Sequence, residues 1–212
     1  MRRWKLLLAG SALLVSAATQ AATFSFNDSF AGSDALTTPG RQILGGEPSI
    51  VFDPALDLFA FQSNALASSP VSFANGVIAD VPPTGTNVVV LRTFDNDNDP
   101  ATPFGAGNAA NLIADRITTS GPGLFVYFNS GLNLPRLVYS TDISDSGADL
   151  KILARMTNLV GAAGQQAMQQ FSAADFTFVA SPVPEPSTLL LLGSGAALLA
   201  FVRRGQGRRR AP

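Results

Sequence analysis

The sequence has 212 residues and a formal net charge of −1, and it contains neither cysteine nor histidine. Without cysteine there can be no disulfide, thiol nucleophile or thiolate metal site, and without histidine the usual general base is missing. Eight of the 14 basic residues lie close to the two ends, so the segment between the ends is strongly acidic. Such a segment repels phosphate backbones, and we expect no binding to nucleic acid.

Residues 1–21 have the three parts of a secretory signal peptide. The basic start consists of Arg2, Arg3 and Lys5. An uncharged apolar run follows at 6–15, and small residues then lead to Ala21. The run is about half the length of a membrane-spanning helix, which favours a cleaved leader over an anchor. We expect export by the general secretion machinery, with cleavage after Ala21 or, as the close alternative, after Ala22.

Residues 22–182 predict one exported domain of mainly β structure. The runs with strand character are 23–26, 87–94, 124–128, 136–140, 150–156 and 176–179. Residues 124–128 and 136–140 flank a short turn-forming segment and together predict a hairpin. The run at 150–156 alternates, which places Leu150, Ile152, Ala154 and Met156 on one face. The two tyrosines of the hairpin, Tyr127 and Tyr139, alternate with apolar residues and are expected in the core.

Two helices are expected between the strands. Asn108 can cap a helix at 109–117, whose apolar residues share a face. A weaker, glutamine-rich helix is expected at 164–171. The fold class that follows is mainly β, a single β-sandwich or jelly-roll-like domain with one or two short helices.

An acidic run after the strand at 87–94 is the sharpest local feature. Asp95, Asp97 and Asp99 alternate like the first three ligands of a calcium-binding loop. Pro100 then stands where such a loop needs glycine, and Ala106 where it needs a bidentate glutamate, so this is not an EF-hand. Two interpretations stay open. One is a looser calcium site, and the other is a solvated turn in which the aspartates bind their own backbone.

A second acidic set, Asp142, Asp145 and Asp149, is a weaker candidate for metal binding. The serine and glycine residues among these aspartates predict a loop and not a helix face. Catalytic patterns are weaker still. Lys151, the single lysine outside the leader, is expected on a solvated strand position, and no pair of carboxylates is marked out for glycoside hydrolysis. We therefore expect a protein that is not an enzyme.

Residues 183–212 form a tail with three parts. Pro184, Glu185 and Pro186 predict a stiff, extended and accessible segment, because proline neither continues a helix nor donates to a sheet. An uncharged run at 187–202 predicts a single hydrophobic helix. The basic residues at its end are Arg203, Arg204, Arg208, Arg209 and Arg210. They place the end of the tail in the cytoplasm and the preceding domain outside it.

The tail resembles the PEP-CTERM sorting signal through Pro184-Glu185-Pro186, the apolar run and the arginine-rich end. This resemblance implies an exosortase-type processing protease as partner, attachment to the membrane through the C-terminal helix, and a Gram-negative host that makes exopolysaccharide. It implies an inner-membrane-anchored intermediate, followed by delivery to the cell envelope or extracellular matrix. It carries no information on what the central domain binds.

The function expected from these observations is that of an exported cell-surface or matrix protein of the kind associated with exopolysaccharide and biofilms. The main alternative is a carbohydrate-binding module, with or without calcium, that contacts extracellular polysaccharide. A glycoside hydrolase is a distant alternative. The hydrolase is placed last because no pair of carboxylates is marked out for catalysis, and the sequence does not say what the domain binds.

Overall fold

The computed structural model describes residues 20–27, 41–95, 97 and 99–180. The chain divides into two units, Met1–Ala180 and Ser181–Pro212. The fold described below belongs to the first unit. Most of the predicted leader and the whole apolar tail helix lie outside the described residues. Among the residues that are described, no helix has the length and apolar character needed to cross a membrane.

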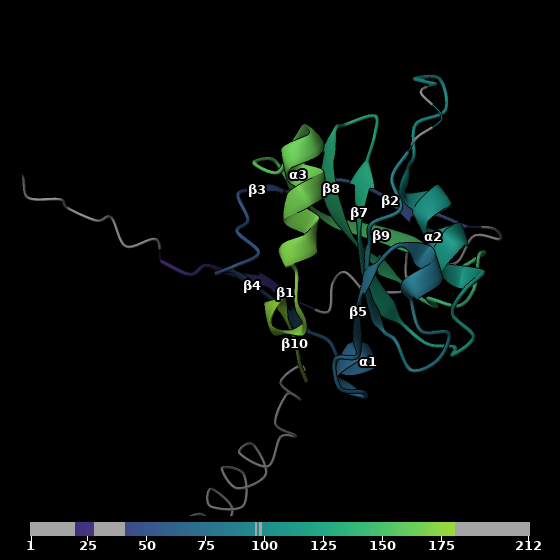
Figure 1. The fold of residues 1–212 in the computed structure, drawn as a ribbon. Coiled ribbons are helices and arrows are strands. Elements are labelled where there is room, and N and C mark those ends of the chain that lie inside the picture. Colours follow the sequence, from purple (N-terminus) through teal and green to yellow (C-terminus); the bar gives the residue numbers. More distant parts are fainter. Residues whose placement is uncertain (1–19, 28–40, 96, 98, 181–212) are drawn as a thin grey trace, which may run out of the picture. The chain divides into compact units, whose positions relative to one another are not determined.

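A mixed sheet forms the centre of the domain, in the order β2-β9-β8-β7-β6-β5 (Figure 1). Its strands are β2 (Ile43–Leu44), β5 (Phe73–Gly76), β6 (Val88–Leu91), β7 (Gly123–Asn129), β8 (Leu134–Ser140) and β9 (Leu150–Met156). β3 (Ser49–Ile50) continues the edge that β2 begins, and both pair with β9. β8 is antiparallel to both of its neighbours, β7 and β9. β6 is parallel to both of its neighbours, β5 and β7.

A second, smaller sheet has the order β1-β4-β10, with both pairings parallel. Its strands are β1 (Thr23–Phe26), β4 (Leu58–Gln62) and β10 (Phe176–Val179). The helices are α1 (Asn64–Ala67), α2 (Ala106–Ala114) and α3 (Gly161–Ala167). Short 3-10 turns lie at Ile78–Asp80, Met168–Gln170 and Ala173–Asp175.

The large sheet is covered on both faces, which explains why β6 and β7 are buried along their whole length. One face packs against the small sheet and the segment after α3, through a cluster rich in phenylalanine. Phe52 and Phe59 stack at its centre with ring centroids 4.1 Å apart. The other face packs against α2, through Ala109 and Ile113. Figure 1 shows α2 and α3 on opposite sides of the large sheet.

The expectation of a mainly β domain with few short helices is confirmed, but the details differ from a jelly roll. A jelly roll is antiparallel, whereas the small sheet is wholly parallel and the large sheet is mixed. The crossover connection between the parallel strands β6 and β7 contains α2. Sheet packs on sheet on one face only, and a helix covers the other.

The hairpin of β7 and β8 is confirmed, with Leu124 opposite Tyr139. Tyr127 and Tyr139 are buried, as expected of core residues. The predicted helix at 109–117 is present three residues earlier, as α2. Asn108 lies inside its first turn, and its side-chain oxygen accepts the backbone N–H of Gly105 at 3.0 Å. The weaker helix is also present, as α3 and the 3-10 turn that follows it.

The expected single apolar face of β9 is wrong. Leu150 and Ile152 face α2, whereas Leu153, Ala154 and Met156 belong to the cluster on the opposite face. The register between β8 and β9 shifts between Leu137 and Val138, where the ladder passes from Ala154 to Ile152. A bulge of this kind adds one residue to a strand and reverses the alternation after it. The apolar residues of β9 therefore contribute to the core clusters on both faces of the large sheet.

Candidate functional site

The acidic run lies at the carboxyl end of β6, in the connection that leads to α2. Asp95, Asp97 and Asp99 line an open hollow of about 420 Å3 together with Pro100, Pro103, Ser130 and Gly131. The hollow therefore joins the loop after β6 to the loop after β7. The carboxyl ends of parallel strands are where open α/β sheets bind their ligands, which makes this hollow a candidate site.

Each described carboxylate of this run is already bonded to nearby protein groups. Asp95 accepts the Ser130 hydroxyl at 2.5 Å and the backbone N–H of Phe104 at 3.1 Å. Asp97 accepts the N–H of Asp99 at 2.8 Å and the Thr102 hydroxyl at 3.0 Å. Asp99 accepts the N–H of Ala101 at 2.9 Å, so the three aspartates form successive Asx turns.

Hydrogen bonds stabilise the ionised form of Asp95. The hydroxyl of Ser130 contributes most, and the backbone N–H groups of Phe104 and Asp97 add to it, so that the pKa of Asp95 lies below its ordinary value. Loss of hydration, the second-largest contribution after the Ser130 hydroxyl, acts in the opposite direction but does not outweigh the hydrogen bonds. Asp95 is consequently a carboxylate at neutral pH, and it ties the loop to the turn of the β7–β8 hairpin.

The arrangement does not bring the three carboxylates together around one point. Within the described parts of the chain, no three acidic side chains are grouped closely enough to hold a metal ion. Calcium binding at Asp95, Asp97 and Asp99 stays a prediction, and it requires the Asx turns to open so that the oxygens can face one ion.

Calcium is expected to raise the unfolding midpoint if it binds this loop, because a ligand that binds only the native state stabilises it by mass action. Magnesium should act more weakly, since it demands a tight octahedral shell. Asp97→Asn should reduce the calcium effect and leave the fold intact, because Asp97 is exposed. Thermal unfolding followed by circular dichroism in millimolar calcium and in chelator measures this. Equal midpoints would leave the loop as a solvated turn.

The second acidic set is spread over a loop, as expected, and its members have separate partners. Asp142 binds the hydroxyls of Ser120 and Ser144. Burial alone would raise the pKa of Asp142, but these hydrogen bonds and those from backbone N–H groups outweigh it and lower the pKa. Asp145 accepts the N–H of Gly147, and Asp149 accepts that of Gln42. All three carboxylates are therefore used to fix the loop.

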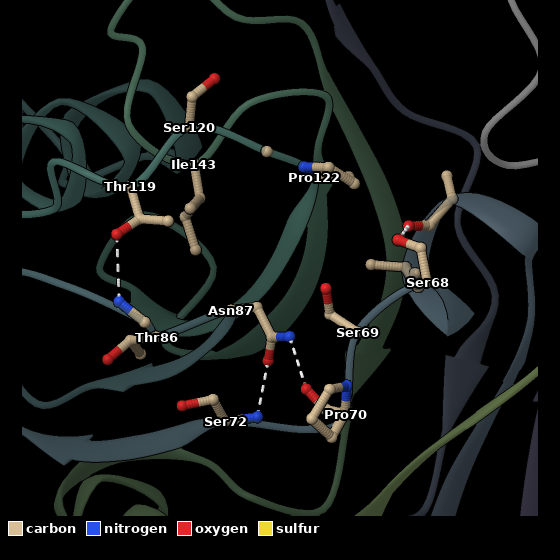
Figure 2. A pocket seen from close by; sticks show the side chains of 14 residues that line it. Ser68, Ser69, Pro70, Ser72, Thr86, Asn87, Thr119, Ser120, Pro122 and Ile143 are labelled. Carbon is tan, nitrogen blue, oxygen red and sulfur yellow. Dashed lines mark hydrogen bonds between the residues drawn. The ribbon is translucent and has the colours of Figure 1, made fainter.

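A second hollow, of about 400 Å3, lies at the opposite end of the parallel strands, where β5, β6 and β7 begin (Figure 2). Its lining is uncharged and rich in hydroxyl groups, from Ser68, Ser69, Ser72, Thr86, Thr119 and Ser120. Asn87 holds the wall together, because its side chain accepts the N–H of Ser72 and donates to the carbonyl of Pro70, both at 2.8 Å. No pattern in the sequence marked this hollow, because its residues come from four separate segments.

Nζ of Lys151 donates to the carbonyl of Gly45 at 3.1 Å. Among the described residues, no hydrogen bond joins it to a serine hydroxyl. Tyr127 and Tyr139 are buried, so neither ring is available to stack on a sugar.

The sorting residues Pro184, Glu185 and Pro186 and the five tail arginines lie outside the described residues, so the tail is assigned by comparison with known proteins. Residues 182–210 match the PEP-CTERM protein-sorting motif. The match covers the tail, as expected, and the central domain remains unassigned. Neither the curated proteins nor the solved structures gave a match. The tail identifies the chain as an exported exosortase substrate that passes through a membrane-anchored sorting intermediate.

Proposed function

We propose that the protein is a non-enzymatic cell-surface or extracellular-matrix protein of a Gram-negative bacterium, delivered by its PEP-CTERM tail. The observation that carries this proposal is the match of residues 182–210 to the sorting motif. Such a tail serves proteins that work outside the cytoplasmic membrane. The strongly acidic domain and the absence of histidine and cysteine from the sequence support a binding or structural role.

The architecture of the domain fits a structural role. Both faces of the central sheet are covered, and the large apolar side chains are gathered in two clusters. Open hollows lie at the two ends of the parallel strands, and a further one lies beside Phe52 and Asp57. Among the carboxylates that line the hollow after β6, Asp95 has a pKa below its ordinary value, the opposite of what the general acid of a glycoside hydrolase needs.

Fractionation of the native host with and without its exosortase tests the proposal. With the enzyme, we expect the protein in the outer envelope or the matrix, shortened at the C-terminus. Without it, we expect the unshortened protein in the inner-membrane fraction, because the apolar run still anchors the chain. An unchanged distribution and an unchanged mass would contradict the proposal.

A carbohydrate-binding module is the second candidate, and the hydroxyl-lined hollow favours it. Side chains such as Ser72 and Thr86 can exchange hydrogen bonds with a neutral, polyhydroxylated ligand, and the uncharged wall suits such a ligand. Calorimetry with a panel of neutral and acidic polysaccharides separates the two candidates. Release of reducing sugar, lost on changing two specific aspartates, would instead indicate the hydrolase.

A further inference from the structure

The carboxylate of Asp57 lies directly against the residue that follows the predicted signal-peptide cleavage point. Oδ1 of Asp57 accepts the backbone N–H of Ala22 at 2.7 Å. Oδ2 of the same carboxylate accepts the N–H of Asp53 at 2.8 Å. Asp57 is only 9% exposed as a residue, and it lines a hollow at the start of β1.

Asp57 has no cationic partner in the described part of the chain. The ion pairs found there both involve Glu47, with Arg136 and Arg155. The hollow beside Asp57, of about 540 Å3, is lined by Asp53 and by uncharged residues. The carboxylate of Asp57 therefore has two neutral hydrogen-bond donors and no positive charge beside it in this part of the chain.

The position of Ala22 is fixed by the strand that follows it and not by the leader. Its carbonyl accepts the N–H of Leu58 at 2.9 Å, and the parallel ladder continues with Thr23 opposite Leu58. Phe24 and Phe26 of β1 pack on the phenylalanine cluster. The nitrogen of Ala22 therefore stays beside Asp57 when the preceding residues are removed.

We propose that the leader is cut between Ala21 and Ala22, and that the new α-ammonium group of Ala22 becomes the counter-ion of Asp57. Water adds to the carbonyl carbon of Ala21 and the carbon–nitrogen bond breaks. The oxygen of the water stays on the Ala21 carboxylate, and both protons of the water end on the Ala22 nitrogen, which becomes an ammonium group. The neutral hydrogen bond to Asp57 thereby becomes a charge-assisted one, which is stronger.

This assignment selects one of the two cleavage points that the leader allows. A chain that began at Thr23 would lose both the bond from Ala22 to Asp57 and the bond from Leu58 to Ala22. Ala21 and Ala22 are exposed, so a peptidase can reach the bond between them. Removal of the leader then creates an ion pair at the start of β1. The mature protein should therefore be more stable than its precursor. The inference rests on the proposed export.

N-terminal sequencing of the protein from the native host is the first test. We expect Ala22 as the first residue. A protein that begins at Thr23 but is still exported would overturn this inference and leave the proposed function standing. A protein that still begins at Met1 would contradict the predicted leader itself, and with it both proposals.

The second test measures the ion pair. A chain from Ala22 to Pro212 with a free amino group is compared in detergent with the same chain extended by Gln20 and Ala21. We expect the free form to unfold roughly 3–8 °C higher, as a charge-assisted hydrogen bond does in a domain of this size. Asp57→Asn should remove most of that difference, because asparagine keeps the acceptor and loses the charge.

Asp53→Asn is the matched control, since Asp53 is exposed and its carboxylate binds the N–H of Ala55 and not that of Ala22. The control should keep the difference between the free and extended forms. Equal unfolding midpoints of the two forms would overturn the inference. A loss of equal size from Asp57→Asn in both forms would also overturn it, because the effect would not depend on the new charge.

Discussion

Replacement of Pro184, Glu185 and Pro186 by alanine is expected to stop C-terminal processing while the protein stays in the membrane. Proline neither continues a helix nor donates to a sheet, whereas alanine is the strongest helix former, so the substitutions change both the side chains and the backbone preference of the sorting element. The exosortase would then lose the element that it recognises, whereas residues 187–202 and the terminal arginines would still anchor the chain.

Intact-mass spectrometry and fractionation measure this effect. The wild-type protein should be cut near Ser187 and Thr188, and the triple variant should keep its full C-terminus. Pro182→Ala with Val183→Ala is the matched control, because it changes neighbouring residues outside the three-residue element. A triple variant with the wild-type mature mass would show that the element is not required.

Local sequence features were sufficient to predict the elements whose contacts are close in sequence. The hairpin of β7 and β8 needs only a turn of a few residues between two apolar runs. Helix α2 has its apolar face within nine residues, but its start was placed three residues too late, because Asn108, expected as the cap, lies in the first turn and Gly105 is the N-cap. The turn interpretation of Asp95, Asp97 and Asp99 depends on bonds to residues two positions away, which is also local.

The middle strand of the small sheet was missed, although its residues carry a signal. Phe59 and Phe61 alternate with smaller or polar neighbours in β4, and both are fully buried. The strand is short, and its partners β1 and β10 lie far away at the two ends of the domain. Parallel pairing leaves no turn between partners, so the sequence does not show which strands meet.

The bulge in β9 shows a different limit. The alternation of apolar residues there predicts one buried face, and it would be right for a strand without irregularity. The extra residue at the Leu153 position becomes visible only when β8 is placed beside β9. The contact of Ala22 with Asp57, 35 residues apart, is likewise a product of strand pairing.

The cluster of Glu47, Arg136 and Arg155 was also not predicted from the sequence. Glu47 lies between β2 and β3, and its Oε1 binds Nη2 of Arg136 at 2.5 Å and Nη2 of Arg155 at 3.0 Å. Its side chain is 1% exposed. The two arginines occupy facing positions on β8 and β9, where like charges repel unless a carboxylate lies between them. Arg136 also contacts the Tyr127 hydroxyl at 3.4 Å.

Glu47→Gln is therefore expected to destabilise the domain by about 2–4 kcal/mol, somewhat less than the ~3–5 kcal/mol for breaking a fully buried ion pair, because Arg155 is partly exposed. Glutamine keeps the size of the side chain but leaves the two guanidinium groups without a counter-charge. The unfolding midpoint at pH 7 should fall by roughly 6–12 °C. Asp115→Asn, at an exposed position after α2, is the control and should change stability by no more than about 0.5 kcal/mol.

The stabilisation by Glu47 should also depend on pH. Burial alone would raise the pKa of Glu47, but its hydrogen bonds and the charges of Arg136 and Arg155 outweigh burial and lower the pKa below its ordinary value. A carboxyl whose pKa is lowered by folding contributes stability above its unfolded pKa, about 4.3, and loses it as pH falls through the folded value. The wild type should thus approach the Glu47→Gln variant in stability as the pH falls from about 5 toward 3. Urea unfolding of both proteins across this range measures the convergence, and a gap that stays constant with pH would contradict the assignment of the effect to the Glu47 charge.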